Sequence, residues 1–158
     1  MTFESNLDMV INNLEANINA SFSNYFNTSE YDQSPDRVYG LLQCYGEATA
    51  EECFSFSQDI ATQIREKCGN ATAGNYLLDN YFMRYESYSF FGILDITTFT
   101  SYRLAKIMDE PEVFRKEVRE LLTNLADEAL GSPIQYSSRF TTTSTFIPIY
   151  SLLQCWGI

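Results

Sequence analysis

The stretch VYGLLQCYGEATAEEC, residues Val38–Cys53, decides how this chain folds, because its first half returns at the end of the chain. Residues Ile149–Gly157 read IYSLLQCWG and repeat the order of aromatic, Leu-Leu, Gln-Cys and Gly. The two tyrosines that open this pattern, Tyr39 and Tyr150, lie 111 positions apart. Because self-similarity at a fixed spacing marks a repeated structural unit, we expect more of the chain to return at that spacing.

A helix returns at the same spacing. Apolar residues recur every three or four positions in two segments, which is the pattern of an amphipathic helix. They are Leu7, Val10, Ile11, Leu14 and Ile18 in the first segment, and Phe114, Val118, Leu121, Leu122, Leu125 and Ala129 in the second. Pro111 favours the start of the second helix and Gly131 its end. We therefore predict a repeated helix–strand unit with a small change of loop length between helix and strand.

The first copy continues beyond the repeated part. Residues Ala50–Lys67 predict a helix, and Asn75–Phe91 predict one or two strands rich in Tyr and Phe. Alternation along these strands predicts two faces, one with Leu77, Tyr81, Met83 and Tyr85, and the other with Leu78, Phe82 and Arg84.

The second copy has no counterpart of this later half. We therefore predict two domains, a first module in residues 1–98 without its N-terminal strand, and the N-terminal part of a truncated second module in residues 99–158. Since the second helix has no complete sheet to cover, we expect Glu112–Leu130 to pack against the first module.

Composition excludes several classes of function. Ten Lys and Arg residues against 21 Asp and Glu give a net charge of -11, which disfavours nucleic acid and anionic membranes as partners. The chain has no histidine, which removes the commonest general base and the commonest metal ligand. No apolar run approaches the roughly 18 residues of a membrane span, and the opening MTFESNLDMV lacks the pattern of a secretory signal. No cofactor is expected.

Three features together resemble the plant salt-stress-response/antifungal domain. They are the run DRVYGLLQC, the cysteines Cys53 and Cys68 that follow it, and the run NYFMRYESYSFFG. This ginkbilobin-like module occurs in cysteine-rich receptor-like kinases and plasmodesmata-located proteins, often as a tandem pair, and the opening TFESNLDMVINNLEANI is similar to its first helix. The resemblance implies an α+β fold with two helices on an antiparallel sheet of about five strands. It also implies secretion, and mannose binding in some members.

The resemblance implies a disulfide between Cys44 and Cys53. Phe56 stands at the family's third cysteine position, and Tyr81 stands at the position of that cysteine's partner. Both ends of one family bridge are therefore aromatic here, and we predict that Phe56 and Tyr81 touch in the core.

The other two cysteines lack the partners that the resemblance implies. The partner of Cys68 would precede this sequence, and the partner of Cys155 would follow it. A bridge between Cys68 and Cys155 is the arithmetic alternative. No metal site is expected, because the spacing C-x8-C is not that of zinc ligands and no histidine completes a site.

A sugar site is implied by the resemblance alone. The resemblance implies that ginkbilobin-like members bind mannose through an asparagine, an arginine and a glutamate. The asparagine position would precede this sequence, Asn75 stands at the arginine position and Glu86 at the glutamate position. Glu86 is either an acceptor for a sugar hydroxyl or a solvated carboxylate at a strand end, and the second interpretation is favoured. Arg84 is expected to form a surface ion pair with Asp79 or Glu86. Exposed aromatic rings would also suit a sugar, but rings at strand spacing are more often core.

Three sequons accompany these features. Asn19, Asn27 and Asn70 each precede the pattern of an N-glycosylation acceptor, and a secreted chain would carry glycans at such sites. Asp109, Glu110 and Glu112 form an acidic cluster that indicates a helix start rather than a cation site.

The sequence thus favours a non-enzymatic, extracellular recognition or defence module that binds a mannose-type glycan or another protein. The alternative is a degenerate intracellular paralogue, cytoplasmic and without sugar binding, that acts as a protein-interaction module. A hydrolase with two carboxylates is a third interpretation, although no spacing singles out such a pair. The strand that ends at Cys155 would present an unpaired edge, so a homodimer through the second module is a further hypothesis.

Overall fold

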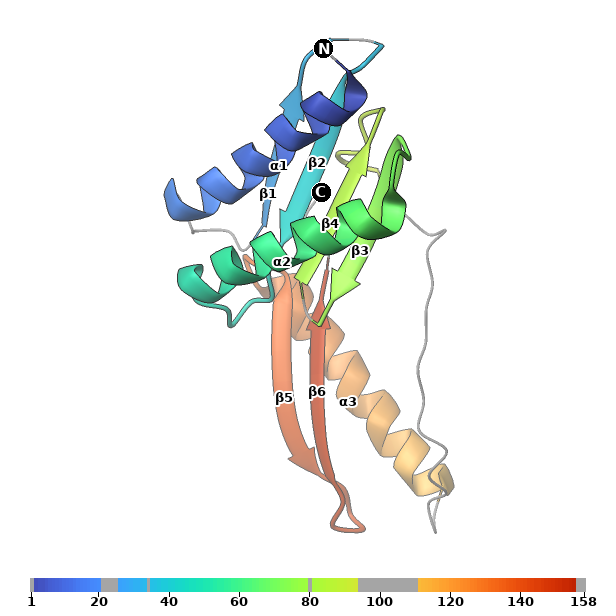
Figure 1. Cartoon of the computed structure of the whole chain (residues 1–158). Coiled ribbons are helices and arrows are strands. Elements are labelled where there is room, and N and C mark those ends of the chain that lie inside the picture. Colours follow the sequence, from blue (N-terminus) through green and yellow to red (C-terminus); the bar gives the residue numbers. More distant parts are fainter. Residues whose placement is uncertain (1, 21–25, 34, 80, 94–110, 156–158) are drawn as a thin grey trace. The chain divides into compact units, whose positions relative to one another are not determined.

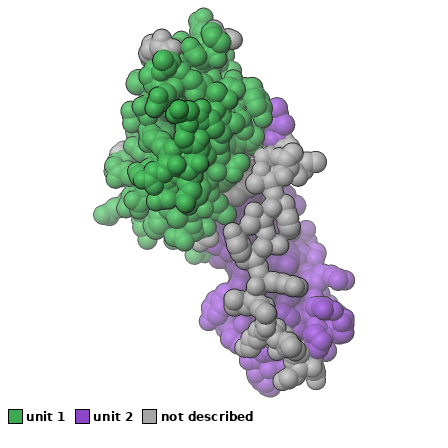
Figure 2. Space-filling view, turned by 45° about the vertical axis from the view of Figure 1, so that its right-hand side comes forward, with its two compact units in different colours: residues 1–92, 157–158 green, residues 93–156 purple. Residues whose placement is uncertain are grey.

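The computed structural model describes residues 2–20, 26–33, 35–79, 81–93 and 111–155 (Figure 1). These residues form two compact units, one within residues 1–92 and one within residues 93–156 (Figure 2). The first unit contains helices α1 (Phe3–Ala20) and α2 (Ala50–Cys68) and strands β1 (Phe26–Tyr31), β2 (Val38–Gln43), β3 (Ala73–Leu78) and β4 (Tyr81–Glu86). The second unit contains helix α3 (Pro111–Gly131) and strands β5 (Tyr136–Thr142) and β6 (Pro148–Gln154).

The first unit has the predicted α+β architecture. Its four strands form an antiparallel sheet in the order β1-β2-β4-β3, one strand fewer in the described residues than the family number of about five. Helices α1 and α2 both lie across one face of this sheet (Figure 1). The core between the layers contains Val10, Ile11 and Leu14 of α1, Ile60 and Ile64 of α2, and Val38, Leu42, Met83 and Tyr85 of the sheet.

Helix α2 starts at a capping box, which fixes the position of Cys53 in its first turn. The Thr49 side chain accepts a hydrogen bond from the Glu52 amide, and the Glu52 carboxylate accepts one from the Thr49 amide at 2.8 Å. These reciprocal bonds satisfy helix amides that would otherwise have no partner. The bonds from Thr49 also hold the pKa of Glu52 below its ordinary value.

The turn between β3 and β4 changes which residues share a face. Leu78 pairs with Tyr81 and Leu77 with Phe82, because only two residues separate the strands and Asp79 takes a positive φ of 52°. Directly paired residues lie on the same face of a sheet. Leu77 therefore shares a face with Phe82 rather than with Tyr81, and the prediction that grouped Leu77 with Tyr81, and Leu78 with Phe82, was wrong. It treated the two strands as one continuous strand.

The second unit repeats α1, β1 and β2 as α3, β5 and β6. Helix α3 packs on the two strands and buries Leu121, Leu125 and Ala129. The pairing of Tyr39 with Glu30 in β2 and β1 becomes the pairing of Tyr150 with Phe140 in β6 and β5. The spacing is thus 111 residues between β2 and β6, and 110 residues between β1 and β5. Compared with the first unit, the second has one residue fewer between its helix and its first strand, and one residue more between its two strands. This is the predicted small change of loop length. The predicted packing of α3 on the first module stays a prediction.

The central strand of the first unit carries a glycine where α1 crosses it. A Cβ atom at Gly40 would overlap with Val10 and lie 3.1 Å from the Leu14 side chain. The absence of a side chain therefore lets α1 approach β2 closely. Ser151 occupies the corresponding position of β6, where its hydroxyl donates to the Arg139 carbonyl at 3.0 Å. The close approach thus belongs to the first unit.

We predict that Gly40→Ser lowers the free energy of unfolding of the first unit by about 1–3 kcal/mol, the usual cost of forcing extra atoms into a packed core. Urea denaturation followed by circular dichroism measures the change. Ser151→Gly is the matched control at the equivalent position and should change stability by less than about 1 kcal/mol. Equal stability of wild type and Gly40→Ser would show that α1 is not tightly packed on β2.

Two tyrosines on β4 are buried in the core. The Tyr81 ring stacks on the Phe56 ring, with centroids 4.1 Å apart and an angle of 10° between the planes. The Tyr85 hydroxyl donates to the Ala71 carbonyl at 3.1 Å. Burial raises the pKa of Tyr81 to about 12, helped by Tyr45 and Glu52, and it raises the pKa of Tyr85 to about 12, helped by Cys68.

These two pKa values predict a loss of stability in alkali. Tyrosine in the unfolded chain ionises near pH 10, so the contribution of both groups is complete below pH 10 and disappears as the pH rises towards about 12. The urea midpoint should therefore fall across this range, and Tyr81→Phe should make the fall shallower. Tyr88→Phe, at an exposed ring, should leave the slope as in the wild type. Identical slopes for Tyr81→Phe and wild type would contradict the argument.

Candidate functional site

The outer face of the first sheet, opposite the two helices, carries an ion pair. Alternation along β4 places Arg84 and Glu86 on this face, because Tyr81, Met83 and Tyr85 point into the core. The Arg84 guanidinium donates to the Glu86 carboxylate through Nε at 3.2 Å and Nη2 at 3.0 Å. The two side chains are only 13% and 10% exposed.

An aromatic residue after β4 explains this burial. The Phe90 ring is itself 2% exposed, and its centroid lies 4.4 Å from the Arg84 guanidinium carbon, the geometry of a cation–π contact. The predicted pairing of Arg84 with Glu86 is confirmed, but the pair is largely buried, so the predictions of a surface pair and of a solvated Glu86 carboxylate were wrong. The alternation of β4 located the pair on its face, but it could not reveal that Phe90 covers it.

Asn75 lies beside this pair on the outer face. Its partner across the ladder is Arg84, and the partner of Glu86 is Ala73, so Asn75 and Glu86 are diagonal neighbours. Such neighbours are typically about 7–8 Å apart. Asn75 is exposed on β3, which is the last strand in the order of this sheet. The two residues that the resemblance would assign to sugar binding thus share one face, with Arg84 between them in the register.

Aromatic rings flank the pair on the side of β2. Tyr39 pairs with Glu86 in the ladder, and its ring meets the Phe91 ring edge to face at 5.7 Å. Arg37 donates to the Tyr39 hydroxyl at 3.1 Å, which raises the pKa of the Arg37 guanidinium. We call Tyr39, Asn75, Arg84, Glu86 and Phe91 the outer-face cluster. It combines hydrogen-bond donors, acceptors and rings in one place.

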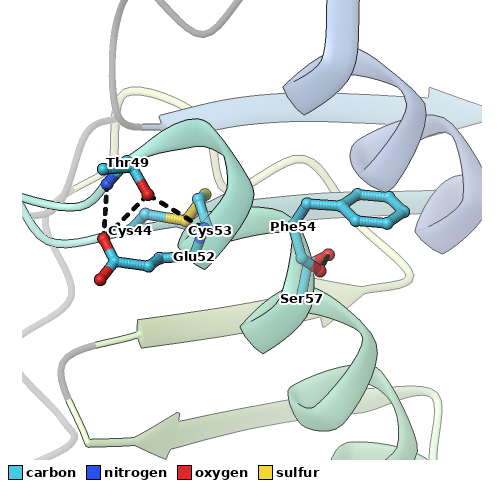
Figure 3. The surroundings of a disulfide bond; sticks show 6 residues. All are labelled: Cys44, Thr49, Glu52, Cys53, Phe54 and Ser57. Carbon is cyan, nitrogen blue, oxygen red and sulfur yellow. Dashed lines mark hydrogen bonds between the residues drawn. A yellow bond between two sulfur atoms is a disulfide. The ribbon is translucent and has the colours of Figure 1, made fainter.

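The disulfide implied by the family is present in the structure. Cys44, directly after β2, and Cys53, in the first turn of α2, are bonded with their Cα atoms 5.7 Å apart (Figure 3). Both residues are buried, and the capping box lies beside them. The bond ties the start of α2 to the end of β2, and thus to the strand that pairs with β4.

The aromatic pair that replaces a family bridge is in contact. Phe56 of α2 stacks on Tyr81 of β4, and Tyr45 meets the Tyr81 ring edge to face at 5.5 Å. Such contacts contribute roughly 0.5–1.5 kcal/mol beyond the burial of the rings. Cys68 and Cys155 take part in no disulfide in the structure, and because they lie in different units, the bridge between them stays a prediction.

The three sequons differ in their surroundings. Asn70 is exposed in the turn after α2. Asn27 is half-buried on β1 and pairs with Leu42, so it faces the helices, and its Oδ1 atom is buried without a hydrogen bond. Asn19 lies in the last turn of α1, and its side chain is outside the described residues, as are Asp109 and Glu110 of the acidic cluster.

Two further classes of site have no counterpart in the described residues. Within them, no group of three or more His, Cys, Asp or Glu residues is arranged to hold a metal ion. None of the described helices combines the length and the apolar character needed to cross a membrane.

Known proteins share both the sequence pattern and the fold. The family model described as salt stress response/antifungal matches residues 1–88. Cysteine-rich repeat secretory protein 38 of Arabidopsis thaliana is 31% identical over 97% of this chain and 60% of its own length. An antimicrobial ginkbilobin-2-like protein of Castanea crenata is 24% identical over 97% of this chain and 62% of its own length. The chain thus spans about 60% of the length of these relatives.

A solved structure extends the similarity in fold to most of the chain. The tandem DUF26 ectodomain of the Arabidopsis thaliana cysteine-rich receptor-like protein PDLP8 has a TM-score of 0.72 at 24% identity, and covers 86% of this chain and 63% of that one. The family match over more than half of the residues, together with this fold, settles the classification. This chain belongs to the salt stress response/antifungal family.

Proposed function

We propose that the chain is an extracellular recognition module of plant defence that binds a neutral, mannose-type glycan at the outer-face cluster. The observation that carries the proposal is the ion pair of Arg84 and Glu86, held against Phe90 beside the exposed Asn75. The parts of the Arg84 guanidinium and the Glu86 carboxylate that stay accessible, 13% and 10% of the two side chains, would present donors and acceptors to sugar hydroxyls. Because both side chains are largely buried already, ligand binding costs little conformational entropy at these two residues.

The charge of the chain supports a neutral ligand. A net charge of -11 repels anionic polymers, whereas a mannose-type glycan carries no charge. A ring of Tyr39 or Phe91 beside the hydroxyl-binding groups would give the apolar face of a sugar a surface to stack on. The carboxylate of Glu86 is a stronger hydrogen-bond acceptor than the neutral amide of Asn75, since hydrogen bonds to charged groups contribute more than those between neutral groups.

The relatives support the extracellular part of the proposal. One of them is named a cysteine-rich repeat secretory protein and another is named an antimicrobial protein. The disulfide between Cys44 and Cys53 favours the same location over the cytoplasm, because such bonds persist in oxidising compartments. The intracellular alternative is supported by the aromatic pair of Phe56 and Tyr81, which replaces a bridge by a contact that needs no oxidation.

The division into a first module of residues 1–98 and a partial second module of residues 99–158 is part of the proposal. So is a homodimer through the second module. Among the described residues, β6 pairs with β5 alone, whereas its counterpart β2 pairs on both sides. The open edge of β6 could add a strand from a second copy. Sedimentation that shows only monomer at high concentration would exclude this dimer.

We predict that the chain, produced in a secretory host, binds yeast mannan in calorimetry, and that two substitutions weaken the binding. Glu86→Gln removes the charged acceptor and should cost about tenfold or more in affinity. Asn75→Ala removes a neutral group on an exposed strand and should cost about fivefold without loss of stability.

Ser87→Ala, at an exposed residue directly after β4, is the control and should bind like the wild type. Circular dichroism of each variant separates a lost ligand contact from a lost fold. A folded wild type that does not bind mannan would refute the glycan ligand. Binding that survives both substitutions unchanged would refute the site.

Glycosylation gives a second, independent prediction about the location. On passage through a secretory pathway, Asn70 should carry a glycan, because its side chain is exposed in a turn. Asn27 should stay bare, since it faces the helices. Intact mass before and after enzymatic deglycosylation, compared with Asn70→Gln, measures this. A glycan on Asn27 and none on Asn70 would contradict the assignment of these faces.

A further inference from the structure

Arg37 carries hydrogen-bond donors at the border of the outer-face cluster. Its Nη1 atom donates to the Tyr39 hydroxyl at 3.1 Å, and its guanidinium carbon lies 5.9 Å from the centre of the Tyr39 ring. Its Nε atom donates to the Asp32 carbonyl at 2.8 Å. Within the described residues, Nη2 makes no hydrogen bond and no carboxylate forms an ion pair with Arg37. The guanidinium therefore keeps donors for a ligand.

Glu86, the partner of Tyr39 in the ladder, offers an acceptor beside this tyrosine. Both hydrogen bonds from Arg84 go to the Oε1 atom of Glu86. Oε2 accepts none within the described residues, and it is not one of the buried polar atoms that lack a partner. Oε2 is therefore the oxygen of this carboxylate that a ligand can reach. Tyr39 thus has an acceptor next to it in the sheet and the donors of Arg37 at its hydroxyl.

A buried asparagine of helix α1 holds the loop that leads to Arg37. Asn6 is 0% exposed, and its Nδ2 atom donates to the Asp36 carbonyl at 2.8 Å and to the Asp32 carboxylate at 3.1 Å. Asp32 has a positive φ of 69°, and its carbonyl is the one that binds Arg37. The loop between β1 and β2 is thus attached to the core at both of its ends. A guanidinium held in this way loses little conformational entropy when it binds.

The charges around Arg37 select the chemistry of its ligand. Glu30 of β1 pairs with Tyr39 and is exposed. The Tyr39 hydroxyl raises the pKa of Arg37 most, and the charges of Glu30 and Asp32 raise it further, so both acids act on this guanidinium. A ligand carboxylate placed here would meet two negative charges on a chain whose net charge is -11. A sugar hydroxyl accepts a hydrogen bond without that repulsion.

We propose that Arg37 is a further ligand-binding residue of the glycan site, and that Asn6 is a positioning residue that acts through it. The inference rests on the proposed function and adds donors on the β2 side of the outer-face cluster. One hydroxyl of the glycan would donate to Oε2 of Glu86, while another oxygen of the same glycan accepts from Nη2 of Arg37. The site would thereby select neutral glycans that place an acceptor oxygen near the Tyr39 hydroxyl.

Calorimetry of mannan binding to the full chain tests the role of Arg37. Arg37→Ala should lower the affinity about tenfold, the loss expected for one hydrogen bond from a charged donor. Arg37→Lys should lower it less, because a lysine keeps the charge but not the planar fork of donors. Arg65→Ala is the matched control, since it removes the same charge from helix α2, on the other face of the sheet, and it should bind like the wild type.

A double-mutant cycle tests whether Asn6 acts through Arg37. Asn6→Asp keeps the size of the side chain but removes the donor to the loop, so it should weaken mannan binding about threefold. In the Arg37→Ala background the same substitution should change the affinity by less than about 1.5-fold, because the residue that it positions is gone. An equal loss of affinity in both backgrounds would overturn the positioning role and assign Asn6 to the general packing of the core.

The outcomes separate this inference from the proposed function. A folded wild type that does not bind mannan would overturn both. Mannan binding that Arg37→Ala and Arg37→Lys leave unchanged would overturn the role of Arg37 alone. Tighter binding of the anionic glycan polygalacturonate than of mannan, lost in Arg37→Ala, would show that Arg37 pairs with a ligand carboxylate and would overturn the selection of a neutral glycan.

Discussion

The packing of a helix across the strands of its own unit is the contact on which both units depend. In the first unit α1 lies on β2 at Gly40, and in the second α3 lies on the hairpin that contains β6. The central strand β2 then pairs with β4, and β4 presents one set of side chains to the helices and the other to the outer face. The positions of Arg84 and Glu86 in the outer-face cluster therefore follow from the packing of the core, because the side chains of β4 alternate between the two faces of the sheet.

The disulfide and the aromatic pair both attach helix α2 to the sheet, but by different kinds of interaction. The bond between Cys44 and Cys53 ties the end of β2 to the start of α2. The stack of Phe56 on Tyr81 ties the same helix to β4. A covalent bond restricts the unfolded chain, whereas stacked rings act only in the folded state. One covalent link is therefore combined with a packing contact whose strength depends on the neutral form of Tyr81.

The sequence predicted the repeat, the helices and the contact between Phe56 and Tyr81, because periodicity and the family's cysteine positions are local signals. It misplaced Leu77, since a two-residue turn leaves the alternating pattern without a visible break. It also misjudged the burial of the ion pair of Arg84 and Glu86, because Phe90, which comes after β4, lies over the Arg84 guanidinium. A contact of that kind is decided by the path of a loop, on which neither periodicity nor composition carries information.

The two units differ in the number of apolar side chains that they bury. Among the described residues, the second unit buries four apolar side chains, Leu121, Leu125, Ala129 and Tyr136, and the first buries the other eighteen of the core residues. A two-stranded hairpin with one helix is close to the lower limit of independent stability. Leu122 of α3 is 46% exposed, so even the helix of the described second unit buries only part of its apolar side. Burial of apolar surface is the main favourable contribution to folding, so most of the stability of the described residues comes from the first unit.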